Sequence, residues 1–354
     1  MVEAKIKETN RELASRHWTR GPEHSKPVTM EQSAHHKRGV REPVNAAIKQ
    51  ASELLHAGQP IGLPTETVYG LAGDATNDDA VASIFELKKR PHFNPLIVHV
   101  ASVEMAQTLV TLSPLALQLA DRFWPGPLTM VLPRRPDCPV SLLASAGLDT
   151  LAIRIPGHPV AQALLQESGL PLAAPSANIS GNISPTTATH VADQLDLPII
   201  LDGGPCTVGV ESTILRVDES GVVLLRPGGV ALEDVESTLG QPVETLTKPD
   251  KITAPGQMLS HYAPSKPIRL NAVGLADGEG LLAFGEPLKG AKVVANLSAA
   301  SNTTEAAANL FAMMHQLDAA DCTAIAVMPI LTEGLGQAIN DRLGRAAAPK
   351  DGKP

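Results

Sequence analysis

The chain of 354 residues has few aromatic residues, three cysteines and no excess of positive charge. Aromatic residues make up only 3% of it, so a platform of stacked rings for single-stranded nucleic acid is not expected. Cys138, Cys206 and Cys322 lie far apart in no C-x-x-C arrangement, which indicates neither a disulfide framework nor a zinc site. The formal net charge of -8 argues against a broad nucleic-acid surface but is compatible with a local cationic pocket.

Long hydrophobic runs are missing as well. The apolar runs are shorter than the roughly 18 residues that a membrane-spanning helix needs, and residues 1–44 carry charges where a leader peptide would be apolar. We therefore expect a cytoplasmic protein with no membrane partner. Neither G-x-G-x-x-G nor G-x-x-x-x-G-K-[ST] precedes a helix expected in the last third of the chain, so a dinucleotide-binding or P-loop interpretation of that part lacks its motif.

The residues that are abundant point to an α/β protein. Hydrophobic residues make up 43% of the chain, and 28 glycines and 30 prolines predict aliphatic cores joined by many turns. Changes in composition divide the chain into a mobile N-terminal extension (1–44), a mixed α/β domain (45–238), a linker (239–266), a C-terminal domain (267–346) and a tail (347–354).

Apolar periodicity predicts the individual helices and strands. One helix is expected over NAAIKQASELLHAG, ending at Gly58, and another over NDDAVASIFELKKR, with Asp78 or Asp79 as its N-cap. A third begins after Ser113 with Pro114 at its first position. Further helices are expected near 158–167, 186–195, 304–318 and 334–346, and strands in PIGLPT, PLIVHV, LTMVL, LAIRI, PLAAPS, PIILDGG, STILRV, VVLLRPGG, GLLAFG, KVVANLS and CTAIAVMPI.

Four loop regions that follow strands carry polar residues. Taken alone, each also fits a structural role: SANISGN is a typical turn, the cations of KKRP are typical of a helix C-terminus, and His99 fits a buried core histidine as well as a ligand. The regions are PTETVYG (64–70), KKRPHFNPLIVH (88–99), RIPGHP (154–159) with APSANISGNISPT (174–186), and VESTILR (210–216) with LRPGG (225–229).

Together, in the order PTETVYGL, IFELKKRPHFNPLIVHV, WPGPLT, LAIRIPGHP, PSANISG, SPT, VESTI, LRPGG and HYAP, these segments resemble the YrdC-like L-threonylcarbamoyladenylate synthases, in the long form with a C-terminal domain. The resemblance implies a twisted mixed α/β sheet domain followed by a smaller Rossmann-like α/β domain. It also implies a nucleotidyltransferase that joins L-threonine, bicarbonate and ATP into threonylcarbamoyl-AMP and pyrophosphate, for modification of the adenosine next to the tRNA anticodon. Mg²⁺ is expected with ATP, and tRNA and a downstream threonylcarbamoyl transferase are candidate partners.

The resemblance also implies residue roles. Lys88 and Arg90 are expected to act in catalysis, and Arg154 is the natural partner of the threonine carboxylate because a guanidinium fork matches a planar anion. Tyr262 is expected to close over the nucleotide. No residues are expected to build a metal site. The ATP-binding residues implied are Lys88, Arg90, Asn94, Thr150, Ala174, Ser176, Ser184, Arg226 and Tyr262, and the threonine-binding residues are Thr67, His99, Arg154 and Ser212.

Some features leave alternatives open. The residues Gln257–Ser260 replace the basic residues of the common family version PGMKYRHYAP, so phosphate contacts are not expected there. Glu66 and Glu211 fit outer partners of the site or ordinary structural hydrogen bonding. Two other functions are a non-catalytic RNA-binding module of the same fold and a carbamoyl-adenylate-forming enzyme, and double-stranded RNA binding is expected as a property of the family. The acylphosphatase-like and zinc-finger segments expected of the latter are absent.

Overall fold

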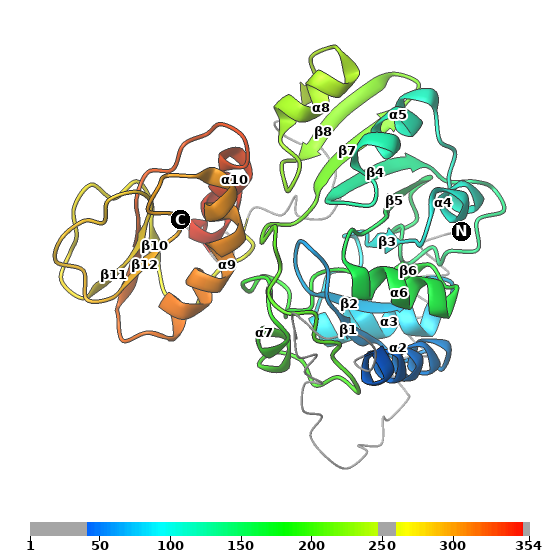
Figure 1. The fold of residues 1–354 in the computed structure, drawn as a ribbon, viewed down its shortest axis with the longest axis horizontal. Helices are drawn as coiled ribbons and strands as arrows, with labels where there is room; N and C mark the ends of the chain where they lie inside the picture. Colours follow the sequence, from blue (N-terminus) through cyan, green and yellow to red (C-terminus); the bar gives the residue numbers. More distant parts are fainter. Residues whose placement is uncertain (1–40, 247–259, 350–354) are drawn as a thin grey trace.

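The computed structural model describes residues 41–246 and 260–349. Three parts of the expected organisation lie outside the described residues. They are most of the N-terminal extension (1–40), the linker residues 247–259, which include Gln257–Leu259, and the end of the tail (350–354). The described residues form a larger domain and a smaller C-terminal domain beside it (Figure 1). The expected fold class is confirmed, because a large mixed sheet is followed by a small parallel one.

Nine strands of the described residues form the large sheet, in the order β1-β2-β6-β3-β5-β4-β7-β8-β9. The pairs β3/β5, β4/β7 and β8/β9 are parallel, and the remaining pairs are antiparallel. The strands are β1 (Ile61–Leu63), β2 (Gly70–Asp74), β3 (Ile97–His99), β4 (Leu128–Pro133), β5 (Thr150–Arg154), β6 (Leu172–Ala173), β7 (Thr213–Asp218), β8 (Gly221–Arg226) and β9 (Glu244–Thr245).

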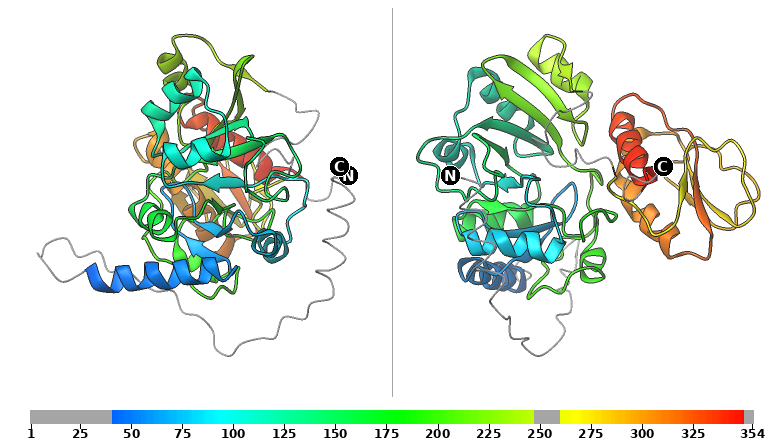
Figure 2. Two further views of the ribbon diagram at one scale, coloured as in Figure 1. Left: turned by 90° about the vertical axis from the view of Figure 1, so that its right-hand side faces the viewer. Right: turned by 180° about the vertical axis from the view of Figure 1, so that it is seen from behind.

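Helices cover both faces of this sheet because neighbouring strand residues point to opposite sides. Leu71 joins one apolar cluster and Ala72 another, and the second cluster holds the residues through which α2 and α6 pack together (Figure 2). The helices are α2 (Arg41–His56), α3 (Asp78–Lys88), α4 (Val103–Leu109), α5 (Pro114–Phe123), α6 (Pro159–Ser168), α7 (Ala188–Ala192) and α8 (Leu232–Leu239).

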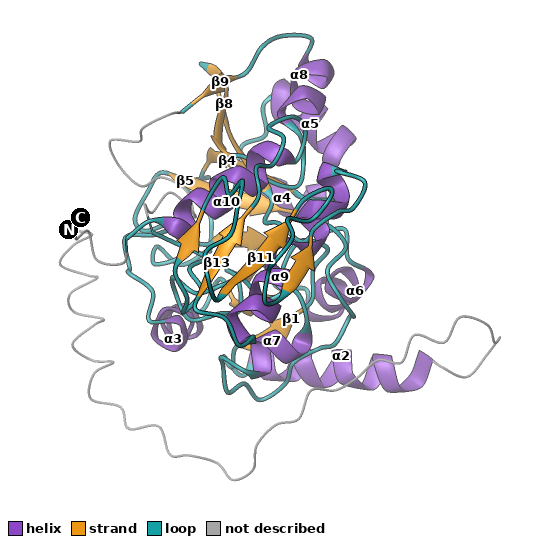
Figure 3. Ribbon diagram, turned by 90° about the vertical axis from the view of Figure 1, so that its left-hand side faces the viewer, coloured by secondary structure: helices purple, strands orange, loops and turns teal. Residues whose placement is uncertain are grey.

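The C-terminal domain has a parallel sheet in the order β10-β13-β11-β12. Figure 3, which looks from the side of this domain, shows the small sheet in front of the larger domain. Its two helices lie between that sheet and the larger domain (Figure 1). The elements are β10 (Ile268–Arg269), β11 (Glu279–Ala283), β12 (Val294–Asn296), α9 (Thr303–Ala319), β13 (Ala324–Val327) and α10 (Gly336–Ala347). Among the described residues, no helix combines the length and apolar character that would let it cross a bilayer.

The helix ends follow the sequence signals with one correction. The expected start of α5 is confirmed, since the Ser113 hydroxyl accepts a hydrogen bond from the N–H of Ala116. The expected N-cap of α3 is wrong. Asn77 holds that position and accepts from the N–H groups of Asp79 and Ala80, so the two aspartates lie in the first turn, where the helix dipole favours them.

The strand expected in PIILDGG is wrong as well. This segment makes only an isolated bridge, because Ile199 and Leu201 both hydrogen-bond to Gly62 and the chain then turns away. Asp202, next along, accepts a hydrogen bond from the Tyr69 hydroxyl. The helix expected near 186–195 spans only α7, and the sequence did not predict the strands β2, β9 and β10 (Ile268–Arg269) or the helices α4 and α8.

The two domains share an apolar cluster. Val68, Ile183 and Val210 of the larger domain pack with Tyr262 and with the buried faces of α9 and α10. At Gly209 the backbone has φ +73°, and an added Cβ would lie 2.4 Å from the carbonyl oxygen of Ala307 in α9. Only glycine therefore permits this close approach between the domains.

Replacing Gly209 by Ala is expected to weaken the docking of the C-terminal domain. The added methyl group must displace backbone atoms of α9, and overpacking of this kind costs about 1–3 kcal/mol. The free energy of unfolding in urea measures the loss. Gly240→Ala is the matched control, since Gly240 has φ +69° but no neighbouring atom within 4 Å of the added Cβ. Equal losses in both variants would show that backbone strain alone explains the effect.

Candidate active site

A cavity opens between the large sheet and the chain segment that leads into the C-terminal domain. Most of the predicted site residues line this central cavity, from loops that are distant in sequence. It is lined by Thr65, Thr67, Val68, Gly70, Arg90, Ile97, His99, Arg154, Ala174, Pro175, Ser176, Glu211, Ser212, Arg226, His261 and Tyr262.

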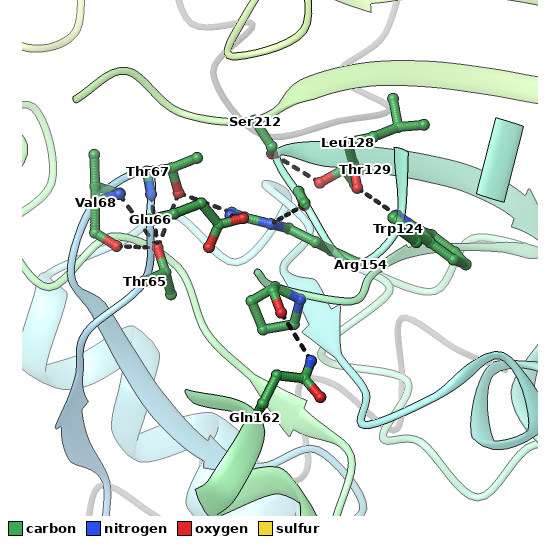
Figure 4. Close-up of polar contacts among 12 residues, drawn as sticks. Thr65, Glu66, Thr67, Val68, Trp124, Leu128, Thr129, Arg154, Gln162 and Ser212 are labelled. Carbon is green, nitrogen blue, oxygen red and sulfur yellow. Dashed lines mark hydrogen bonds and ion pairs between the residues drawn. The ribbon is translucent and has the colours of Figure 1, made fainter. Parts of the chain in front are cut away.

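Arg154 is the centre of a buried polar cluster at the end of β5 (Figure 4). Its guanidinium donates to Glu66 Oε1 at 2.6 Å, to Thr67 Oγ1 at 2.9 Å and to the Gly126 carbonyl oxygen at 3.2 Å. Burial alone would raise the pKa of Glu66, but the Arg154 charge and hydrogen bonds to its carboxylate hold that pKa below its usual range. Since a guanidinium has five N–H donors, these three bonds leave capacity for an anionic ligand.

His99 lies beside Arg154 because parallel strands β3 and β5 pair these two residues in register. The ring is almost completely buried, and its Nδ1 has no hydrogen-bond partner among the described residues. Burial, followed by the Arg154 charge, lowers the pKa of His99 to about 3. The imidazole is therefore neutral at physiological pH and can accept or donate a hydrogen bond in the cavity.

Ser212 and Arg226 form the neighbouring part of the wall. The Ser212 hydroxyl lies 2.7 Å from that of Thr129, and Arg226 Nη2 donates to the Ser212 carbonyl oxygen at 2.8 Å. Burial, the largest influence, lowers the pKa of Arg226 from its ordinary value. The arrangement fixes Ser212 from both sides and brings the guanidinium of Arg226 to the cavity.

The end of α3 and the loop that follows it place the three cations of KKRP in different environments. Arg90 lines the cavity, and its guanidinium donates to the carbonyl oxygens of Asn94 and Pro95 at 3.2 and 2.8 Å. Lys88 does not line it: its buried Nζ donates to the carbonyl oxygens of Ser176 and Asn178 and so supports the opposite loop. Lys89 is exposed, as expected.

Four predicted ATP residues thus lie outside the cavity lining. They are Lys88, Asn94, Thr150 and Ser184. Asn94 is buried within the Arg90 loop, and Thr150 begins β5, four residues before Arg154. Ser184 is also buried, and its hydroxyl donates to Glu211 Oε1 at 2.6 Å. Direct nucleotide contacts by these four residues remain predictions.

Tyr262 closes the side of the cavity that faces the C-terminal domain. It is buried, it has a left-handed backbone conformation with φ 63°, and its ring centroid is 5.5 Å from that of Phe311 in α9. The flanking residues are bound to both domains: His261 N–H donates to the Arg345 carbonyl oxygen, and Ala263 N–H to the Gly181 carbonyl oxygen. Burial raises the pKa of Tyr262, so the ring is a neutral phenol.

Several residues of the site were not singled out from the sequence. Thr65 and Thr129 read as ordinary loop and strand residues, and His261 was noted only as part of HYAP. Arg342 is the largest omission: it lies in an unremarkable amphipathic helix, yet it is fully buried and bound to Glu211. Glu211 in the motif VEST was the available signal for Arg342, since a carboxylate that becomes buried requires a cation or hydrogen bonds.

Chemically, the central cavity presents two kinds of anion-binding group. Arg154 lies with neutral hydroxyl and imidazole groups, while Arg90 and Arg226 supply cations to the same cavity. Among the described residues, no three His, Cys, Asp or Glu side chains come together as a metal site. The arrangement suits a ligand carrying one carboxylate together with a polyanion such as a nucleotide phosphate.

Comparison with known proteins identifies relatives for both domains. The family described as "Telomere recombination" (Sua5_yciO_yrdC) matches residues 53–228, and the family described as "Threonylcarbamoyl-AMP synthase, C-terminal domain" matches residues 230–348. The chain is 49% identical over 230 residues to the threonylcarbamoyl-AMP synthase of Bacillus subtilis, covering 63% of this chain and 66% of that one. It is 39% identical to the threonylcarbamoyl-AMP synthase of Pyrococcus abyssi, covering 87% and 96%.

The fold has a solved counterpart. The crystal structure of P. abyssi Sua5 complexed with L-threonine is similar with a TM-score of 0.79 and 38% sequence identity, and the match covers 85% of this chain and 94% of that one. The similarity therefore extends over both domains.

Replacing His99 by Gln is expected to make the free energy of unfolding depend less steeply on pH below about pH 7. The folded state holds the pKa of His99 near 3, whereas an unfolded histidine titrates near 6.5, so unfolding takes up a proton between these values. As the pH falls through this window, His99 alone lowers the free energy of unfolding by up to about 1.4 kcal/mol per pH unit. Urea unfolding between about pH 4 and pH 7 measures the slope. His92→Gln, at an exposed position, is the control, and equal slopes in all three proteins would contradict the assignment.

Proposed function

The chain belongs to the Sua5/YrdC family of threonylcarbamoyl-AMP synthases, and on this basis we propose that it joins L-threonine, bicarbonate and ATP into threonylcarbamoyl-AMP and pyrophosphate. The observation that carries the proposal is the central cavity itself. It brings the guanidinium of Arg154 and the cations of Arg90 and Arg226 to one pocket. Such a space can hold an amino-acid carboxylate and a nucleotide triphosphate next to each other.

In this proposal threonine binds at the Arg154 cluster. The remaining N–H donors of Arg154 bind the carboxylate, and His99 with its open Nδ1 is placed for the hydroxyl or the amine. Thr67 and Ser212 complete the polar wall. Neutral groups at these positions leave the α-amine of threonine without a charged partner, so it remains available as a nucleophile.

ATP binds across Arg90 and Arg226, and Tyr262 covers it from the C-terminal side. Both arginines are buried, so their attraction for phosphate oxygens is screened much less than it would be at the surface. Burial lowers the pKa of Arg90 to about 10, which still leaves it cationic at neutral pH. Ala174 and Ser176 lie on the same wall, where their backbone groups can contact the nucleoside.

The chemistry needs little general acid or base. An α-amine has a pKa of about 7.7–8.0, so part of it is unprotonated near neutral pH. It attacks bicarbonate to form a carbamate with loss of water, and a carbamate oxygen then displaces pyrophosphate from the α-phosphorus of ATP. The protein contributes proximity and stabilisation of the negative charge that develops on the phosphates.

We also propose that Mg²⁺ enters as the partner of the ATP phosphates. Magnesium sites of this kind use phosphate oxygens, water and one or two carboxylates. The wall offers one carboxylate for this use, since Glu211 lines the cavity. Binding of tRNA, double-stranded RNA or a downstream transferase, and a cytoplasmic location, remain predictions.

The synthase activity is tested by incubating the full chain with ATP, Mg²⁺, bicarbonate and L-threonine. Pyrophosphate and an adenylate with the mass of threonylcarbamoyl-AMP are expected, and neither should form when threonine is omitted or Mg²⁺ is chelated. Folded protein that makes no product with threonine would contradict the proposal. Product formed from carbamoyl phosphate instead would indicate a carbamoyl-adenylate-forming enzyme.

Single substitutions in the two halves of the cavity are expected to affect different substrates. Arg154→Lys keeps a charge beside Glu66 but loses the fork, and it should raise the KM for threonine about 10- to 100-fold while the KM for ATP changes little. Arg90→Ala should lower kcat/KM for ATP by a similar or larger factor. Steady-state pyrophosphate release measures both. Lys89→Ala, at the exposed neighbouring position, is the control. Loss of activity in this variant would indicate that the cations of KKRP act through their overall charge and not through a specific contact of Arg90.

A further inference from the structure

A buried positive charge of the C-terminal domain reaches into the larger domain. Arg342 on α10 is fully buried, and its Nε donates to Glu211 Oε2 at 2.8 Å. Glu211 lines the central cavity just before Ser212 and is 131 residues away in sequence. The contact therefore joins the catalytic wall directly to the second domain.

The other carboxylate oxygen of Glu211 holds Ser184. The Ser184 hydroxyl donates to Oε1 at 2.6 Å, and the carbonyl oxygen of the same residue lies 3.2 Å from Nε2 of His315 in α9. The Ser184–Glu211 pair is thus bound at both ends by side chains of the C-terminal domain. By contrast, the Arg154 cluster is built from residues of the larger domain.

Electrostatics makes this junction sensitive to its partners. Burial alone would raise the pKa of Glu211, but the charges of Arg342 and Arg226 and the Ser184 hydroxyl hold it below its usual range. The carboxylate is therefore ionised while Arg342 is in place. Removing one member of a buried ion pair leaves the other charge without compensation, so the remaining group must move or change its protonation.

We propose that Arg342 is a positioning residue for ATP: through Glu211 it fixes the hydroxyl of Ser184, so the nucleotide half of the cavity is complete only when the C-terminal domain is docked. The inference rests on the proposed function and on the prediction, made from the sequence resemblance, that Ser184 contacts ATP. Threonine does not require this junction, because its binding groups are held within the larger domain. Docking of the second domain then controls ATP affinity separately from threonine affinity.

The experiment compares the full-length wild type with Arg342→Gln in steady-state pyrophosphate release. The KM for ATP is expected to rise about tenfold, within the range of coupling between contacting residues, while the KM for threonine stays within about twofold. Arg269→Gln is the control, because it breaks an ion pair inside the C-terminal domain, Arg269–Glu279, away from the cavity. Equal increases in both KM values, or the same ATP effect in the control, would overturn the proposal.

A double-mutant cycle tests the route through Ser184. If Arg342 acts through that hydroxyl, Arg342→Gln should change the KM for ATP by no more than about twofold once Ser184 is Ala. Independent, multiplying effects would show that Arg342 does not act through Ser184. Should Arg342→Gln fail to fold, Arg342→Lys keeps a positive charge beside Glu211 and Asp341 but loses the fixed Nε hydrogen bond, and it should fold and still raise the KM for ATP. A wild type that releases no pyrophosphate with threonine would instead contradict the proposed function.

Discussion

The buried positive charge of Arg154 is the constraint on which the central cavity depends. Water cannot solvate this guanidinium, so the chain around it supplies a carboxylate, a hydroxyl and a carbonyl oxygen. These partners come from the loop after β1 and from the turn before β4, which are therefore tied to the end of β5. An uncompensated charge at this depth would cost several kcal/mol, and the loop geometry is thus set by electrostatics as much as by packing.

Much of the fold and part of the site could be predicted from local patterns. The start of α5 at Ser113 is such a case, since its hydrogen bond lies within four residues. His99 and Arg154 were assigned to one ligand from motif resemblance, and the parallel pairing of β3 and β5 supplies the physical reason for their proximity. The segment at Ile199 misled the strand prediction, because its apolar run is satisfied by burial with only a single bridge to Gly62.

The remainder could not be predicted because it depends on contacts between distant segments. Nothing in the sequence around Arg342 distinguishes it from a solvated helix cation, since its partner Glu211 belongs to the other domain. For Lys88 the basic motif predicts a ligand contact, but the motif could not show that the ammonium also donates to the backbone carbonyl oxygens of a loop 88 residues away. In both cases the long flexible side chain, and not the position of its Cα atom, decides the contact.

The left-handed backbone at Tyr262 has an energetic consequence for how the two domains hold this residue. A residue other than glycine held at φ 63° costs on the order of 1–3 kcal/mol, and ring contacts with Phe311 and His261 offset that cost only while the segment is in place. The backbone at Tyr262 is therefore held in place by packing against α9, and the position of its ring at the cavity depends on the docking of the C-terminal domain.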